Sequence, residues 1–180
     1  MQRRTIRNRL LASAAALGLT ICALIPASPA AAYTTTGCKW GSSTVTWNAS
    51  NTGSAWSGSA TSAALSWANY SDVNGMTTNS SAAMYAYENN AGASGYDGYT
   101  NWTCVGGSYL GANVTINPYY ANSFSTAKRR AIWVHEFGHG LGLNHGPSNA
   151  LMYTCAACVY NTYGYYYPQA DDIAGMNSIY

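Results

Sequence analysis

The stretch His135-Glu-Phe-Gly-His-Gly-Leu-Gly-Leu-Asn-His145 decides how the rest of this chain is interpreted. His135 and His139 are four residues apart, so on a helix they lie one above the other and both imidazoles can reach one metal ion. Gly142 tolerates a positive φ, which allows the helix to end there and the chain to turn back. That turn would bring His145 to the same ion as a third nitrogen ligand.

Three neutral nitrogen ligands leave the fourth position of a tetrahedral Zn²⁺ open, which is typical of a catalytic rather than a structural zinc site. Such an ion lowers the pKa of its water from about 15.7 toward about 7. Glu136 neighbours the first ligand and is the expected general base, which takes the proton of this water and passes it to the leaving amine. The stretch therefore predicts a hydrolase with one catalytic zinc ion.

The sequence argues against two alternatives to this ligand set. A bare His-Glu-x-x-His occurs by chance in helices, but here all three histidines of the chain lie in the one stretch. Another zinc-protease arrangement takes its third ligand from a glutamate on a later helix. That arrangement is excluded, because Glu88 and Glu136 are the only glutamates and neither follows His145.

The flanking sequence predicts a domain of helices and strands around this site. Ser123 or Ser125 can cap a helix over 127–141, and Asp171 or Asp172 can open a last helix that ends at Ile179. Apolar periodicity predicts the other elements. They are strands over 43–47, 82–88 and 114–117, a helix over 57–69, a long loop over 89–112 and an irregular segment over 143–167.

The first 32 residues have the three parts of a secretory signal peptide: four arginines, an apolar run and an Ala30-Ala31-Ala32 cleavage site. A membrane anchor is the alternative, but the prolines and alanines at the end of the apolar run favour cleavage. The prediction is a signal peptide over 1–32, a catalytic domain over 33–180, and a secreted, extracellular protein. The export route, general secretory or twin-arginine, stays open.

Removal of residues 1–32 would leave four basic and six acidic side chains, a net charge of −2. This charge gives no indication of a nucleic-acid partner, and no other stretch is apolar enough to span a membrane. We expect a monomer that acts on protein or peptide substrates. Four cysteines would remain, and an even number in an exported chain predicts two disulfides with three possible pairings. They are Cys38, Cys104, Cys155 and Cys158.

The stretch 135–145 resembles the signature of the metzincin zinc proteases, which also includes a downstream methionine turn. Ala150-Leu-Met152-Tyr153 is similar to that turn. Within the metzincins, the chain is most similar to the matrixins, the branch of the matrix metalloproteinases. The similarity extends to Pro168-Gln-Ala-Asp-Asp-Ile-Ala-Gly175 and to Ala64-Leu-Ser-Trp-Ala68.

The resemblance implies an α+β catalytic domain with a twisted mixed sheet, an active-site helix and a C-terminal helix. It implies a secreted zinc endopeptidase in which Met152 packs beneath the three imidazoles. It also implies an edge strand that binds extended substrate, here in the segment before Val114, and an aspartate at 171 or 172 that bonds Tyr33 or the methionine turn. The Cys155-Ala-Ala-Cys158 segment would brace the wall of a substrate pocket.

The chain departs from the matrixin pattern at several points. Gly146 follows the third histidine where matrixins have serine, and no propeptide is evident. Matrixins block zinc with a propeptide cysteine, but for Cys38 a disulfide is the expected state. Matrixins also hold a second, structural zinc through other histidines, and because no histidine is left for it here, we expect that zinc site to be absent. The few acidic residues make calcium sites doubtful.

Overall fold

The computed structural model describes residues 32–180, so nearly all of the expected signal peptide lies outside the described part of the chain. The described residues form an α+β domain, as expected. Its elements are β1 (Thr44–Asn51), α1 (Ser54–Tyr70), β2 (Gly75–Thr78), β3 (Met84–Glu88), β4 (Gly98–Val105), β5 (Ser108–Ile116), α2 (Pro118–Ala121), α3 (Thr126–Leu141), α4 (Ala156–Tyr163) and α5 (Ala170–Ile179).

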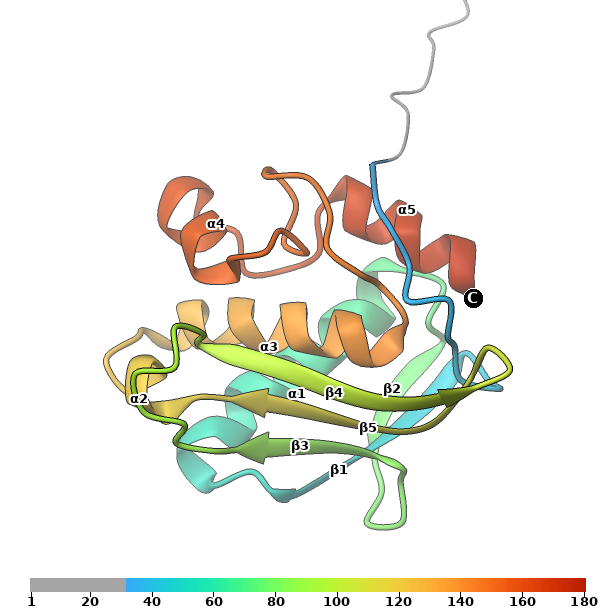
Figure 1. Cartoon of the computed structure of the whole chain (residues 1–180), viewed down its shortest axis with the longest axis horizontal. Coiled ribbons are helices and arrows are strands. Elements are labelled where there is room, and N and C mark those ends of the chain that lie inside the picture. The colour runs from blue at the N-terminus through green and yellow to red at the C-terminus, as the bar shows by residue number, and fades with distance from the viewer. Residues whose placement is uncertain (1–31) are drawn as a thin grey trace, which may run out of the picture.

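A single five-stranded mixed sheet organises the domain, with strand order β2-β1-β3-β5-β4. Strand β1 is parallel to both β2 and β3, and β3 is parallel to β5. Strand β4 is antiparallel to β5 and forms the edge of the sheet. In Figure 1 the sheet twists beneath the helices, and β4 is the strand that runs beside α3.

Helices α1 and α3 cover one face of the sheet, and α4 and α5 lie on the far side of α3 (Figure 1). The core fills the space between the sheet and helices α1 and α3. Its largest side chains are fully buried aromatic and apolar residues from β1, α1, β3 and α3: Trp47, Trp67, Met84, Trp133 and Phe137. Helix α3 is therefore packed on both sides, which holds it rigidly across the middle of the domain.

The loop expected over 89–112 is wrong, because this segment contains β4 and half of β5. The two strands form a hairpin whose turn, Gly106-Gly107, has positive φ angles of 57° and 79°. Consecutive positive φ values suit the tight turns that match the twist of paired strands. Strand β4 gave no apolar alternation because most of its residues are partly or fully exposed at the sheet edge.

Two smaller elements were also missed. Helix α4 lies inside the segment expected to be irregular, and Cys155 begins it by accepting a hydrogen bond from the Cys158 backbone N–H. Strand β2 has only four residues, too few for a periodic pattern. Within residues 32–180, none of the helices has the length and apolarity needed to cross a bilayer.

Candidate active site

Helix α3 positions two of the three histidines. It begins at Thr126, where the Ser125 side chain accepts a hydrogen bond from the Lys128 backbone N–H at 3.2 Å. From Ala131 to Leu141 every residue of the helix is buried, including His135 and His139. The helix thus presents both imidazoles from a backbone that packing holds on all sides.

The chain turns back directly after α3. Gly142 has a φ of 120°, a conformation that residues with a side chain rarely adopt, and a Cβ there would press on the carbonyl of Cys38. The returning segment then pairs with the amino-terminal segment. Thr36 N–H donates to the Gly142 carbonyl, and Asn144 N–H donates to that of Thr34, both at 2.8 Å. This pairing holds the short segment that carries His145.

The three imidazoles converge, with their ligand atoms all within 4.8 Å of one another. His135 Nδ1 lies 2.8 Å from the Leu151 carbonyl and His139 Nδ1 lies 2.9 Å from that of Leu143. A carbonyl only accepts, so both Nδ1 atoms carry the proton and both Nε2 atoms present lone pairs. These two Nε2 atoms are 3.1 Å apart and face each other.

Two bare lone pairs at this distance require a cation between them, and the spacing suits zinc. Zn–N bonds of about 2.0–2.1 Å place the nitrogens of a tetrahedral site about 3.4 Å apart. Burial lowers the pKa of His135 to about 3 and that of His139 to about 4, with the neighbouring histidines contributing to both shifts. The imidazoles are therefore neutral near pH 7, which is the form that binds metal.

Met152 packs against α3 at Gly138, in a turn that hydrogen bonds to α5 hold in place. Its side chain is buried, and a Cβ at Gly138 of α3 would overlap its sulfur. Asp172 in α5 accepts hydrogen bonds from the backbone N–H groups of Leu151 at 2.8 Å and Met152 at 3.0 Å. Because the Leu151 carbonyl accepts from His135, the same turn orients an imidazole.

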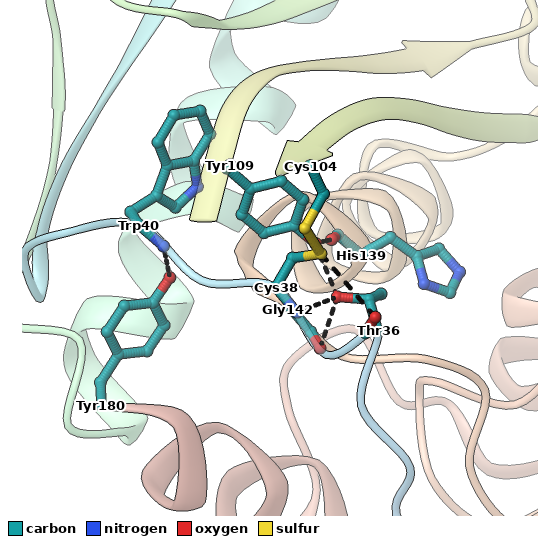
Figure 2. Close-up of a disulfide and its surroundings, with 8 residues drawn as sticks. All are labelled: Thr36, Cys38, Trp40, Cys104, Tyr109, His139, Gly142 and Tyr180. Carbon is teal, nitrogen blue, oxygen red and sulfur yellow. Dashed lines mark hydrogen bonds between the residues drawn. A yellow bond between two sulfur atoms is a disulfide. The ribbon is translucent and has the colours of Figure 1, made fainter. Parts of the chain in front are cut away.

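The carboxyl end of α3 is also fixed by side chains. Tyr109 Oη donates to the His139 carbonyl at 2.7 Å and contacts the Thr36 hydroxyl at 3.0 Å. Figure 2 shows this contact beside the Cys38–Cys104 disulfide, which ties the amino-terminal segment to the end of β4. The next carbonyls accept from Trp40 Nε1, Tyr180 Oη and Thr36 N–H in turn. No carbonyl from His139 to Gly142 is left unpaired.

Glu136 is buried beside the three imidazoles, with 4% of its surface exposed. Burial raises the pKa of its carboxyl group to about 8, although a hydrogen bond from the Thr100 hydroxyl acts in the opposite direction. A carboxyl with a pKa near neutrality can both accept and return a proton at working pH, which is what general acid–base catalysis requires.

A cleft of about 400 Å³ opens over this group of residues. Its walls include the three histidines and Glu136, the β4 residues Gly98, Thr100 and Trp102, and the start of α4 at Cys155 and Ala156. The resemblance implied an edge strand in the segment before Val114, and that edge strand is β4, although periodicity alone had indicated a loop there. Gly98 and Thr100 are small, Trp102 is an isolated aromatic residue, and none of them carries a signal until the sheet places the strand opposite α3.

The four cysteines of the catalytic region form two disulfides, Cys38–Cys104 and Cys155–Cys158. The first links segments that are 66 residues apart in the chain, and the second spans the first turn of α4. The sequence left three pairings possible, and in the structure the second bridge joins the two cysteines that are closest in the chain. Cys155 lines the cleft, and the Cys38–Cys104 bridge lies near the carboxyl end of α3 (Figure 2).

Among known protein families, the model described as Matrixin matches residues 64–180, which include the carboxyl-terminal part of α1, the strands from β2 onward, α3, the methionine turn and α5. A search of curated proteins gives no match.

Proposed function

This chain belongs to the matrixin family of zinc metalloendopeptidases, and from that premise we propose that residues 33–180 form a secreted endopeptidase acting on proteins outside the cell. The observation that carries this proposal is the cluster of His135, His139 and His145 around one point, with Glu136 buried beside it. A site that served only structure would need neither an open ligand position nor this carboxyl group.

In the proposed site, His135, His139 and His145 hold the zinc ion through one nitrogen each. Bound zinc supplies Lewis-acid chemistry: it acidifies a water molecule and polarises the scissile carbonyl. The carbonyls of Leu151 and Leu143 fix two of the rings through their Nδ1–H groups, an arrangement that orients metal-binding imidazoles and raises their basicity.

Glu136 is the proposed general base. Its carboxylate takes a proton from the attacking water and then gives it to the nitrogen of the leaving amine, so the same group serves as base and acid in one turnover. Burial beside the cluster favours the protonated form, and a bound dication would favour the ionised form. These opposing influences keep the proton exchangeable near neutral pH.

Substrate would bind along β4. As the last strand of the sheet it has one edge unpaired within the described residues, and an extended peptide can add to such an edge through backbone hydrogen bonds. The inward residues Gly98, Thr100 and Trp102 would then face the peptide and the metal site together. On the opposite wall, the Cys155–Cys158 disulfide would brace the pocket for the side chain after the scissile bond.

Export of the chain is supported by the signal-like residues 1–32 and by the two disulfides, which persist in oxidising compartments. The Ala32 backbone N–H donates to Asp171 Oδ1 at 2.9 Å, so the chain at the expected cleavage site lies against the start of α5. We propose that the mature protein begins at Tyr33 and acts as a monomer with one catalytic zinc.

A protease assay on residues 33–180 tests the function. Wild type should cleave a denatured protein, a chelator should abolish cleavage, and added zinc should restore it. Glu136→Ala should be inactive while retaining zinc, and Glu88→Ala, which removes the only other glutamate, should remain active. Equal cleavage by wild type and Glu136→Ala would refute the mechanism. Cleavage that a chelator does not affect would refute the role of the metal.

A further inference from the structure

Thr100 is the one side chain within the described residues that donates a hydrogen bond to the carboxyl group of Glu136. It lies in the middle of β4 and points inward, across the cleft toward α3. Its hydroxyl oxygen is 2.8 Å from Glu136 Oε2 and 2.9 Å from the main-chain carbonyl oxygen of Glu136. One hydroxyl group thus contacts two oxygens of the same residue.

A threonine hydroxyl has one proton to donate and two lone pairs that accept. Its proton can point to Oε2 or to the main-chain carbonyl oxygen, and both oxygens lie within hydrogen-bond distance. Because both oxygens belong to Glu136, these contacts fix the side chain of that residue relative to its own backbone.

The surroundings of the carboxyl group leave it little freedom. Gly98, two residues earlier on β4, packs so closely that a Cβ there would lie 2.7 Å from Glu136 Oε1 and 2.8 Å from a methyl group of Ile132. Oε1 receives no hydrogen bond from any of the residues that the structure describes, and it is not among the buried polar atoms that lack a partner. Oε1 is therefore the oxygen that the cleft can reach.

We propose that the Thr100 hydroxyl is a positioning group for Glu136, which holds Oε2 so that the carboxyl group keeps one orientation in the cleft. This inference rests on the proposed role of Glu136 as general base. Thr100 does not touch the reacting atoms. It acts by keeping the base in the orientation that proton transfer requires.

The matched pair Thr100→Val and Thr100→Ser tests this role. Valine keeps the shape and strand propensity of threonine but has no hydroxyl, whereas serine keeps the hydroxyl. A positioned acid or base contributes about 100- to 10,000-fold to rate, so we expect Thr100→Val to lower kcat by about 10- to 100-fold. KM and zinc content should stay at wild-type values, and Thr100→Ser should retain most of the wild-type kcat.

Further variants separate a positioning role from a structural one. Thr77→Val replaces an exposed strand threonine on β2, outside the residues that line the cleft, and should leave kcat unchanged. Thr100→Ala gives a second hydroxyl-free variant should the valine protein fail to fold, with the same expected loss of kcat. A kcat for the hydroxyl-free variant within twofold of wild type would overturn the inference. A loss in Thr100→Ser equal to that in Thr100→Val would also overturn it.

The inference and the proposed function fail in distinguishable ways. If Glu136→Gln is as active as wild type, the base assignment is wrong and the role of Thr100 fails with it. If Glu136→Gln is inactive while Thr100→Val is fully active, the base assignment stands and only the positioning role is wrong. In the Glu136→Gln background, Thr100→Val should cause no further loss of kcat, because the group it positions can no longer exchange a proton.

Discussion

Replacing Asp172 by asparagine removes the charge that holds the methionine turn to α5. The Asp172 carboxyl group is 1% exposed and accepts three backbone hydrogen bonds, from Leu151 and Gln169 on Oδ2 at 2.8 Å each and from Met152 on Oδ1 at 3.0 Å. Burial raises the pKa of this carboxyl, and the three N–H groups act against that shift. Since asparagine has one acceptor oxygen and one donor nitrogen, it cannot satisfy all three donors.

The expected cost in Asp172→Asn follows from these bonds. In the best orientation the amide oxygen replaces Oδ2 and keeps the bonds from Leu151 and Gln169, while the amide nitrogen faces the Met152 N–H. A buried donor left unpaired costs about 1–3 kcal/mol, and loss of the charge weakens each remaining bond by about 1 kcal/mol, so the free energy of unfolding should fall by about 3–5 kcal/mol. For a domain of this size, Tm should fall by roughly 6–20 °C.

Urea unfolding at pH 7, followed by the fluorescence of the buried tryptophans with both disulfides intact, measures this difference. Asp171→Asn is the matched control, because within the described residues the Asp171 side chain accepts one hydrogen bond, from the Ala32 N–H, and none from the methionine turn. We expect this control to lie within about 1 kcal/mol of wild type. If Asp172→Asn and Asp171→Asn unfold within about 0.5 kcal/mol of each other, Asp172 does not hold the turn as described.

The remaining predictions concern the helix and the histidines. Gly138→Ala should be about 1–3 kcal/mol less stable than Gly140→Ala in urea unfolding, because only the first new methyl group overlaps the buried Met152 sulfur. Both substitutions gain the same helix propensity, so equal stabilities would contradict the described packing. Zinc and activity should be lost together as the pH falls toward about 4, because the lowered pKa values of His135 and His139 delay protonation but do not prevent it. Zinc retained at about pH 2 would contradict this ligand set. In the metal-free protein, the two histidines bind protons more readily in the unfolded chain than in the folded one as the pH falls below 6.5. Their lowered pKa values should therefore make the folded state less stable as the pH falls from 6.5 toward about 4, which thermal unfolding measures.

The active-site helix could be predicted from the sequence because every signal there has a local cause. Ser125 caps the helix, good helix formers follow, and Gly142 ends it with a positive φ. The spacing of His135 and His139 is itself a helical period, so the pattern that indicates the metal site also indicates the element that carries it.

The edge strand could not be predicted from periodicity alone, because its structure depends on partners far away in the sequence. Gly98 and Thr100 are poor signals alone, and they become meaningful only when β4 pairs with β5 and faces α3. The contact between Thr100 and Glu136 spans 36 residues, and no local pattern encodes it. The role of the C-terminal aspartates could be predicted in part. The resemblance to matrixins suggested a bond to the methionine turn, and the structure assigns that bond to Asp172.

The zinc content of purified residues 33–180 tests the central claim most directly. Elemental analysis after exhaustive dialysis should find one zinc ion per chain in the wild type. It should find less than about a tenth of that in His139→Ala, whose folding is checked by a cooperative unfolding transition in urea. A wild-type protein without tightly bound metal, or a His139→Ala variant that keeps a full equivalent of zinc, would contradict the claim that these three imidazoles hold the catalytic ion.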